Sequence, residues 1–293
     1  LMVNFRLLEE LDKVFERKTR TIIMGVINLS LDSFSKDGTH DIDQINQQCE
    51  LFINNGADII DLGAQSSRPS TNAILESKTF GEKWGGEVHQ INSEEEVELL
   101  IPVLDSITRN FDVLTSVDTY RSDVAYEAFL NGASLINDIW GLNCDPKIAE
   151  IVAEFKGKLI IMHNQENNVY QDLINDIKQS LITSSDKAIK SGVERKNIIL
   201  DPGFGFGKDV EHNLTLLNNL HELVELGYPL MIGTSRKSFI GAVLNSPIND
   251  RIEGTAATVS VAIAKGADLV RVHDVVEISK TVKMTDAIIR GHQ

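Results

Sequence analysis

Polar and charged side chains follow the short apolar runs of this 293-residue sequence, at the points where those runs end. They are amides, carboxylates, imidazoles and a guanidinium, which can bind a polar ligand or stabilise charge that develops in a reaction. In chain order they are Asn28, Asp118, Asn137 with Asp138, His163, Asp201, and Arg271 to Asp274. One such aspartate is commonly a helix cap or a turn residue. A buried polar group without a partner is costly, so the whole set predicts a shared polar ligand.

The charges in this set fall into two halves. Arg271 and His273 are two residues apart, so they point the same way on a strand. Segment 235–238, Ser-Arg-Lys-Ser, follows an apolar run and opens a helix, a position that favours anions. We therefore expect a cationic part of the rim that binds phosphate. The other half suits a neutral heterocycle with an amino-pyrimidinone edge, and its members are Asp118, Asn137 and Asp201.

Three other features leave alternatives open. Segment 201–208, DPGFGFGK, is rich in glycine but lacks the spacing of a nucleotide-binding loop, so a tight turn is an equal interpretation. Segment 28–35 is polar around Phe34 and is typical of a loop that covers a ligand. His163 is either a metal ligand or a hydrogen-bonded histidine of the rim, and the absence of a His-x-His pair after the first apolar run disfavours the metal.

The elements that position these residues follow from the apolar pattern. Eight apolar runs predict strands at 21–28, 57–62, 114–118, 135–137, 158–163, 198–201, 230–233 and 269–272. They are apolar throughout, which indicates parallel strands buried on both faces. Segment 93–109 has helical spacing of its apolar residues, and Ser93 with Glu96 predicts a capping box. In the last helix Ile278, Val282 and Ile289 fall on one stripe.

Strands that alternate with helices predict a (β/α)8 TIM barrel, whose active site lies at the carboxyl ends of the strands. An open doubly wound sheet is the alternative, but no GxGxxG follows the first strand. We expect one barrel domain over residues 1–293, with a long inserted loop at about 70–92.

The overall composition narrows the class of partner. The formal net charge of −15 disfavours nucleic acid as a partner, although a local cleft can still bind an anion. No apolar run approaches the roughly 20 residues of a membrane span, and the charged amphipathic residues 1–20 are unlike a secretory signal. Cys49 and Cys144 lack disulfide or metal spacing, which predicts a reducing compartment, the cytoplasm.

At these same strand ends the chain resembles the dihydropteroate synthases, the sulfonamide targets of folate biosynthesis. The resemblance runs from about residue 22 to residue 286. Its motifs are MGVIN at 24–28, DSFS at 32–35, SSRP at 66–69, SVDT at 116–119, IND at 136–138, MH at 162–163, DPGFGFGK at 201–208, SRKS at 235–238 and RVHD at 271–274. Each motif is modest alone, but their order on successive barrel loops is specific.

The resemblance implies a transferase that condenses 7,8-dihydropterin-6-ylmethyl diphosphate with p-aminobenzoate to give 7,8-dihydropteroate and diphosphate. It implies that the pterin is held by Asp118, Asn137, Asp201 and Lys237. It assigns the diphosphate to Asn28, Arg271 and His273, with Mg²⁺ at Asn28 and Asp32. It assigns p-aminobenzoate to Ser67, Arg68, Pro69, Phe206, Lys237 and Ser238. Loop closure falls to Asp32, Phe34 and Ser35, and the catalytic set is Asp201, Lys237, Asn28, Arg271 and His273. The family is usually homodimeric.

The second loop departs from the family pattern. The family's Gly-Glu-Ser-Thr-Arg-Pro-Gly reads Ala-Gln-Ser-Ser-Arg-Pro-Ser at 64–70, and about fifteen further residues follow. Two alternatives therefore stay open: a non-catalytic pterin-binding paralogue, and a methyltetrahydrofolate-dependent corrinoid methyltransferase. The retained cations argue against a site without activity, and they are Arg68, Lys237, Arg271 and His273.

Overall fold

The computed structural model describes residues 3–29, 42–64 and 91–291. Within these ranges eight parallel strands form one sheet, in the order β6-β5-β4-β3-β2-β1-β8-β7. Their bounds are β1 Ile22–Asn28, β2 Ile59–Gly63, β3 Leu114–Asp118, β4 Leu135–Asp138, β5 Lys158–Met162, β6 Ile198–Asp201, β7 Met231–Ile232 and β8 Leu269–Val272. The first strand lies between the second and the eighth, so the sheet curls into a (β/α)8 TIM barrel, as the alternation of elements predicts.

The sheet closes at a seam between β6 and β7. These two strands meet at the isolated bridge between Leu200 and Leu230, and the Leu200 N–H donates to Pro229 O at 2.9 Å. The predicted seventh strand, 230–233, is therefore longer than the two-residue strand observed.

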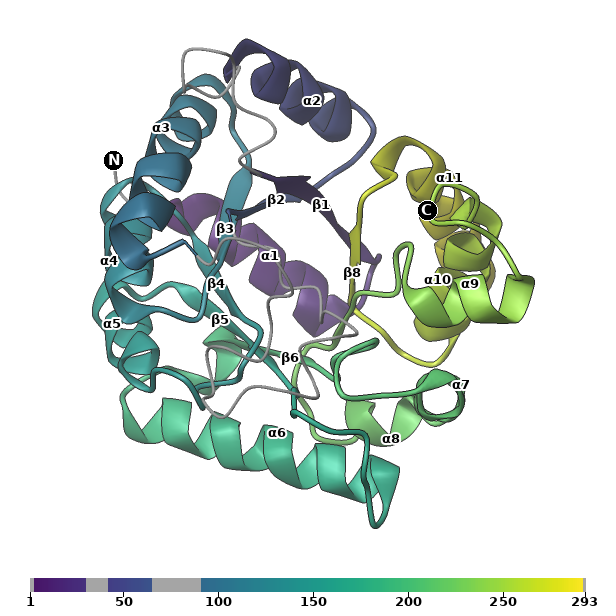
Figure 1. Cartoon of the computed structure of the whole chain (residues 1–293). Coiled ribbons are helices and arrows are strands. Elements are labelled where there is room, and N and C mark those ends of the chain that lie inside the picture. The colour runs from purple at the N-terminus through teal and green to yellow at the C-terminus, as the bar shows by residue number, and fades with distance from the viewer. Residues whose placement is uncertain (1–2, 30–41, 65–90, 292–293) are drawn as a thin grey trace.

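The helices surround this barrel (Figure 1). Those between β1 and β6 are α2 Ile42–Asn54, α3 Ser93–Asn110, α4 Ser122–Leu130, α5 Lys147–Phe155, α6 Leu173–Lys190 and the short 3₁₀ helix η3 Arg195–Asn197. After β6 follow α7 Val210–Asn218 and α8 His221–Val224, and after β7 follow α9 Ser238–Leu244 and α10 Ile252–Ala264. The last helix, α11 Val275–Arg290, packs against α10.

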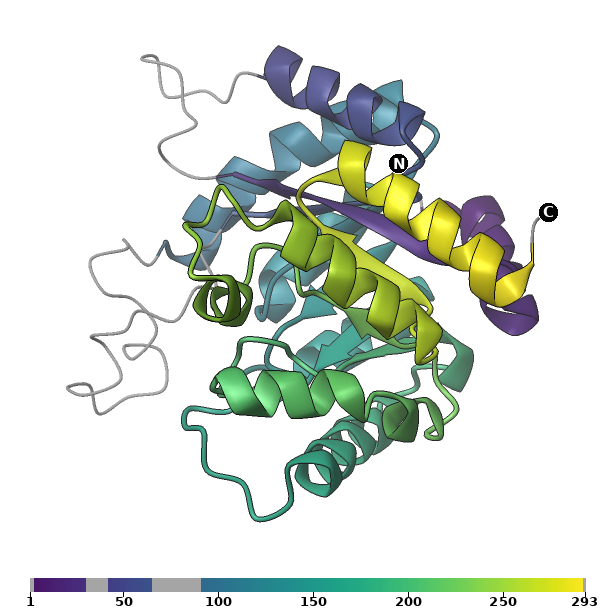
Figure 2. The ribbon, with the colours of Figure 1, turned by 90° about the vertical axis from the view of Figure 1, so that its right-hand side faces the viewer.

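The first helix, α1 Phe5–Arg17, covers the end of the barrel at which the strands begin (Figures 1 and 2). It buries Leu8, Leu11 and Phe15. Its Asp12 pairs with the fully buried Lys158 at the start of β5. The predicted functional side chains lie at the opposite end, where the strands finish.

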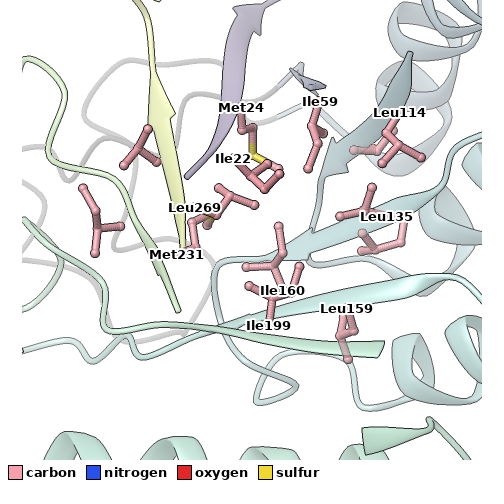
Figure 3. Close-up of a cluster of buried hydrophobic side chains, with 14 of the residues drawn as sticks. Ile22, Met24, Ile59, Leu114, Leu135, Leu159, Ile160, Ile199, Met231 and Leu269 are labelled. Carbon is pink, nitrogen blue, oxygen red and sulfur yellow. The ribbon is translucent and has the colours of Figure 1, made fainter. Parts of the chain in front are cut away.

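The core is built from apolar residues of every strand. Figure 3 labels ten of these side chains, from Ile22 in β1 to Leu269 in β8, and each is buried. Gly25 of β1 shows how closely the outer layer packs, since a Cβ there would lie 2.6 Å from the Phe52 ring of α2. This dense interior is the rigid support that fixes the strand ends relative to one another.

One detail of the predicted helices was wrong. The capping box of α3 is formed by Asn92 and Glu95, not by Ser93 and Glu96. Glu96 instead turns inward, is buried and pairs with Arg121, which explains why it cannot reach back to the helix start. On α11 the predicted stripe runs from the buried Ile278 and Val282 to Ile289, which is 49% exposed.

Candidate functional site

Parallel strands bring the predicted polar residues to one rim. Asn28 ends β1 with an exposed side chain, Asp118 ends β3, and Asp201 ends β6. Asn137 lies in β4 directly beside Asp118 in the strand register. Arg271 lies in β8, one residue before its end. The rim therefore gathers residues that are up to 243 positions apart, the difference between Arg271 and Asn28.

An ion-pair network crosses the mouth of the barrel. The Arg271 Nε donates to Asp61 Oδ2 at 2.7 Å, and its Nη2 donates to Asp118 Oδ2 at 2.9 Å. Asp61 is fully buried in β2, and the side chains of Arg271 and Asp118 are 19% and 10% exposed. One guanidinium thus holds two carboxylates from neighbouring strands.

Asp61 is a candidate site residue that the sequence reasoning missed. It lies in the middle of the apolar run Ile59–Gly63, whereas the predicted site residues lie at the ends of such runs. The usable signal was the charge itself, because a strand buried on both faces tolerates a carboxylate only when a partner is supplied.

Burial sets the protonation behaviour of Asp118. Desolvation raises the pKa of its carboxyl to about 7, against the opposing attraction of Arg271. The neighbouring Asp61 and Glu96 raise it further, and Lys237 lowers it. A ligand that donates a hydrogen bond to Asp118 would favour the carboxylate form.

Three buried polar atoms on adjacent strands have no hydrogen-bond partner among the residues that the structure describes. They are Asp61 Oδ1 on β2, Ser116 Oγ on β3 and Asn137 Oδ1 on β4. Buried polar atoms are nearly always paired, so these atoms indicate a ligand or bound water. Two of them accept hydrogen bonds only, which is the complement of the N–H groups of an amino-pyrimidinone.

Asp201 is held by the glycine-rich segment that follows it. The Gly203 N–H donates to Asp201 Oδ1 at 2.7 Å. Gly203 has φ +72°, and a Cβ there would lie 2.0 Å from the carbonyl oxygen of His163, so this turn requires glycine. Burial raises the pKa of Asp201, while the Gly203 N–H and the cations Lys237, Arg271 and Lys208 lower it. The segment is therefore a tight turn that aims a carboxylate into the mouth.

His163 lies just after β5 as a buried, hydrogen-bonded rim histidine. Its Nδ1 is 3.0 Å from Lys208 Nζ. Burial, and then the charge of Lys208, lower the pKa of His163 to about 3, so its imidazole is neutral at pH 7. No group of three or more His, Cys, Asp or Glu side chains gathers as a metal site within the ranges that the structure describes.

Phe206 and Lys237 meet at the side of the mouth. Lys237 Nζ lies 4.2 Å from the centroid of the Phe206 ring, a cation–π distance. Phe206 packs with Ile139, Trp140 and Met162 in a small apolar cluster apart from the main core. Ser238 begins α9 with an exposed side chain. This wall joins an aromatic surface to a positive charge, which suits an aromatic carboxylate.

The turn after β7 is fixed by the segment after β8. Arg236 has φ +58° and pairs through two nitrogens with Asp274, with Nε at 2.9 Å from Oδ2. Ser235 Oγ accepts from the His273 N–H at 3.2 Å and lies 3.0 Å from His273 Nδ1. These contacts hold Lys237 in place between Ser235, Arg236 and α9.

The expected cationic rim needs two corrections. Burial, followed by Arg271 and Arg236, lowers the pKa of His273 to about 4, so this histidine is neutral at pH 7. Arg271 and His273 also bond to different groups, Arg271 to Asp61 and Asp118 and His273 to Ser235. The reason is that β8 ends at Val272, so strand alternation does not extend to His273.

Part of the predicted site lies outside the described residues. It comprises Asp32, Phe34 and Ser35 of the first loop, Ser67, Arg68 and Pro69 of the second, and most of the long loop at about 70–92.

Known proteins that are similar to this chain identify its family. A family model described as pterin binding enzyme matches residues 24–79 and 81–273. The dihydropteroate synthase of Clostridium beijerinckii is 45% identical over 280 residues, which are 95% of this chain and 98% of that protein. A crystal structure of dihydropteroate synthase from Clostridium difficile, in the presence of pteroic acid, has a TM-score of 0.83 at 42% identity, over 92% of this chain and 97% of that one. The Xanthomonas albilineans dihydropteroate synthase with 4-aminobenzoic acid has a TM-score of 0.81 at 30% identity, over 92% and 93% of the two chains.

Proposed function

Because the chain belongs to the dihydropteroate synthases of the pterin-binding enzyme family, we propose that its barrel rim carries out their reaction with the side chains described above. The reaction joins 7,8-dihydropterin-6-ylmethyl diphosphate to p-aminobenzoate and releases diphosphate. The observation that carries the proposal is the set of buried polar atoms on β2, β3 and β4, in register with Asp118, that have no partner among the described residues. They complement the N–H groups of a pterin.

In this proposal the pterin lies between the carboxylates and Lys237. Asn137 Oδ1 accepts from a ring N–H, Asp201 accepts from the amino-pyrimidinone edge, and Lys237 donates to the ring oxygen. Asp118 accepts a hydrogen bond from the opposite edge of the pterin, where the bound ring takes the place of water. The arrangement requires acceptors that are already oriented, and the buried amide of Asn137 and the turn at Gly203 supply this orientation.

The diphosphate would be bound by Asn28, Arg271 and His273. Asn28 has an exposed side chain at the rim, and His273 can donate a hydrogen bond as a neutral imidazole. Arg271 would then exchange part of its contact with Asp61 and Asp118 for the anion. The two carboxylates keep the guanidinium oriented before the substrate arrives.

Mg²⁺ is part of the proposal because a diphosphate is a hard, highly charged oxygen ligand. The amide oxygen of Asn28 is a ligand type that Mg²⁺ accepts, and this ion keeps several waters rather than needing a full protein cage. Asp32, the second expected ligand, lies outside the described residues. When bound, the ion supplies positive charge that neutralises the leaving diphosphate.

The chain's own residues act on the carbon that loses the diphosphate. As the bond to oxygen breaks, positive charge develops on the pterin methylene and spreads into the ring. The Asp201 carboxylate, fixed by Gly203, stabilises that charge. The arylamine then attacks the methylene carbon, and its surplus proton passes to water, so a strong general base is unnecessary. The Phe206 and Lys237 wall holds the ring and carboxylate of p-aminobenzoate.

Release of diphosphate from the pterin substrate with Mg²⁺ tests this function. We expect release that depends on p-aminobenzoate, that yields dihydropteroate and that stops when the metal is chelated. Pterin binding without turnover would favour the non-catalytic paralogue and point to the divergent segment 64–70. Methyl transfer from methyltetrahydrofolate to a corrinoid would favour the methyltransferase.

We also propose a homodimer formed by α9, α10 and α11, which lie together on one side of the molecule (Figure 2). Large apolar side chains are exposed on these helices, among them Val243 at 57%, Met284 at 63% and Ile288 at 68%. Exposed apolar residues that gather on adjacent elements mark a contact surface.

The two free cysteines and the small-molecule substrates favour the cytoplasm as the compartment. Among the described helices, none has the length and apolarity needed to cross a membrane.

The variant Met284→Glu with Ile288→Glu is expected to convert the dimer to a monomer, because it places four charges in the shared interface of two copies. Analytical ultracentrifugation measures the change. Val169→Glu is the control, since Val169 is 75% exposed but lies outside these helices. A wild-type protein that sediments as a monomer would contradict the proposed dimer.

A further inference from the structure

Lys208 lies at the end of the glycine-rich segment and has no role in the mechanism above. Its Nζ is 3.0 Å from each of three acceptors: the carbonyl oxygens of Gly203 and Phe206, and Nδ1 of His163. An ammonium group has three protons, so the three contacts use all of them. The third contact requires His163 Nδ1 to be unprotonated, which matches a neutral imidazole.

These contacts tie the turn at 203–207 into one conformation. Gly203, Gly205 and Gly207 have φ of +72°, +80° and +55°, and such a glycine-rich turn has little intrinsic preference for one shape. Without the ammonium group, the two carbonyl oxygens would lose their donor in a partly buried place. Tyr170 adds support, because its hydroxyl donates to Gly207 O at 2.8 Å.

The turn carries the aromatic wall of the proposed arylamine site. Phe206 contributes both its carbonyl oxygen to Lys208 and its ring to Lys237. A Cβ at Gly205 would lie 3.0 Å from Lys237 Cδ, so the turn and this lysine are in close contact. Movement of the turn therefore moves the ring against which Lys237 is placed.

On the basis of the proposed function, we propose that Lys208 is a positioning residue for the arylamine site, and that its ammonium group fixes the turn 203–207 and thereby the Phe206 ring beside Lys237. Asp118 and Asn137 on the pterin side depend on it less, because they belong to β3 and β4, whereas Asp201 and Lys237 contact the turn itself.

The charge environment of Lys208 makes this function sensitive to pH. His163 faces it from the end of β5, Asp201 from β6, Lys237 from the turn after β7, and Tyr170 from the segment before α6, with its ring centroid 6.0 Å away. Burial lowers the pKa of Lys208 to about 7, and Asp201 opposes this shift. Above that pH the amine loses its charge and has only two protons for the three groups around it, which weakens its hold on the turn.

The test is the variant Lys208→Met, which keeps the length of the side chain and removes the charge. We expect the KM for p-aminobenzoate to rise about tenfold or more, since small displacements of a bound reactant are costly. The Kd for 6-hydroxymethylpterin should rise by a clearly smaller factor than this KM, and the thermal midpoint should stay near that of the control Lys190→Met. Wild-type kcat/KM for p-aminobenzoate, at saturating pterin diphosphate, should fall above pH 7, and the variant should lack this limb.

Two further experiments test the contact between Lys208 and His163. His163→Gln, which retains an acceptor, should rescue the KM that His163→Leu raises. In ¹⁵N-histidine NMR spectra of the wild type, His163 should be neutral with its proton on Nε2, and Lys208→Met should abolish that fixed tautomer. An unchanged KM in Lys208→Met, or equal losses of pterin and arylamine binding with a lower midpoint, would overturn the proposal. Absence of turnover in the wild type would count against the proposed function, while the NMR readout still decides the contact between Lys208 and His163.

Discussion

Asp201→Asn should lower kcat for the condensation by about a hundred- to a thousandfold, the size of loss typical when one preorganised electrostatic group is removed. The physical reason is the charge that develops on the pterin as diphosphate departs. An amide keeps the shape of the side chain and can keep the bond from the Gly203 N–H, but it lacks the negative charge. The effect should therefore fall on kcat, with the thermal midpoint nearly unchanged.

Steady-state assays of diphosphate release, together with calorimetric unfolding, measure both quantities. Asp209→Asn is the matched control, because Asp209 caps α7 through its side chain and asparagine caps a helix equally well. We expect the control to keep wild-type kcat. A normal kcat/KM in Asp201→Asn would remove this carboxylate from the mechanism.

Arg271→Met should abolish measurable turnover and also lower the free energy of unfolding by about 3–5 kcal/mol, the usual cost of removing one partner from a buried ion pair. It leaves Asp61 and Asp118 together, without their shared guanidinium. Adding Asp61→Asn to this variant should restore part of the stability without restoring turnover. That difference separates the structural effect of Arg271 from its effect on the reaction.

The loss of stability should be larger at pH 8.5 than at pH 5.5. An aspartate titrates near pH 3.9 in the unfolded chain, whereas the folded pKa of Asp118 is about 7. Between these values the native state binds more protons, so the contribution of this group to stability falls as pH rises. Removing Arg271 raises the folded pKa further, which extends the loss to higher pH. Urea unfolding at both pH values measures it, and an equal loss at the two would contradict this account.

The strands and the residues at their ends could be predicted from the sequence because both are local patterns. Asp118, Asn137 and Asp201 follow apolar runs, and parallel strands must bring such ends to one rim. The same pattern could not reveal Asp61, whose partner Arg271 is 210 residues away and is set by the barrel's register.

The protonation states of the site residues could not be predicted from the sequence pattern either. His273 was expected to add positive charge, but its neutral state comes from burial and from nearby cations contributed by other parts of the chain. Lys208 belongs to a motif that the sequence reasoning treated as a turn or a weak nucleotide signature. Its function depends on a contact with His163, which follows a different strand. In both cases the decisive neighbours are close in space but not in sequence.

The weak pairing between β6 and β7 means that the bound substrate can also stabilise the closed barrel. Asp201 ends the strand on one side of this joint, and Lys237 follows the strand on the other. The backbone pairing there is slight, being the bridge between Leu200 and Leu230 with the bond to Pro229 O. A pterin that contacts both side chains links the two strands that are most weakly paired in the barrel. Part of its binding free energy then stabilises the contact between β6 and β7. We therefore expect these strands to separate transiently in the enzyme without substrate and to stay paired when the pterin is bound.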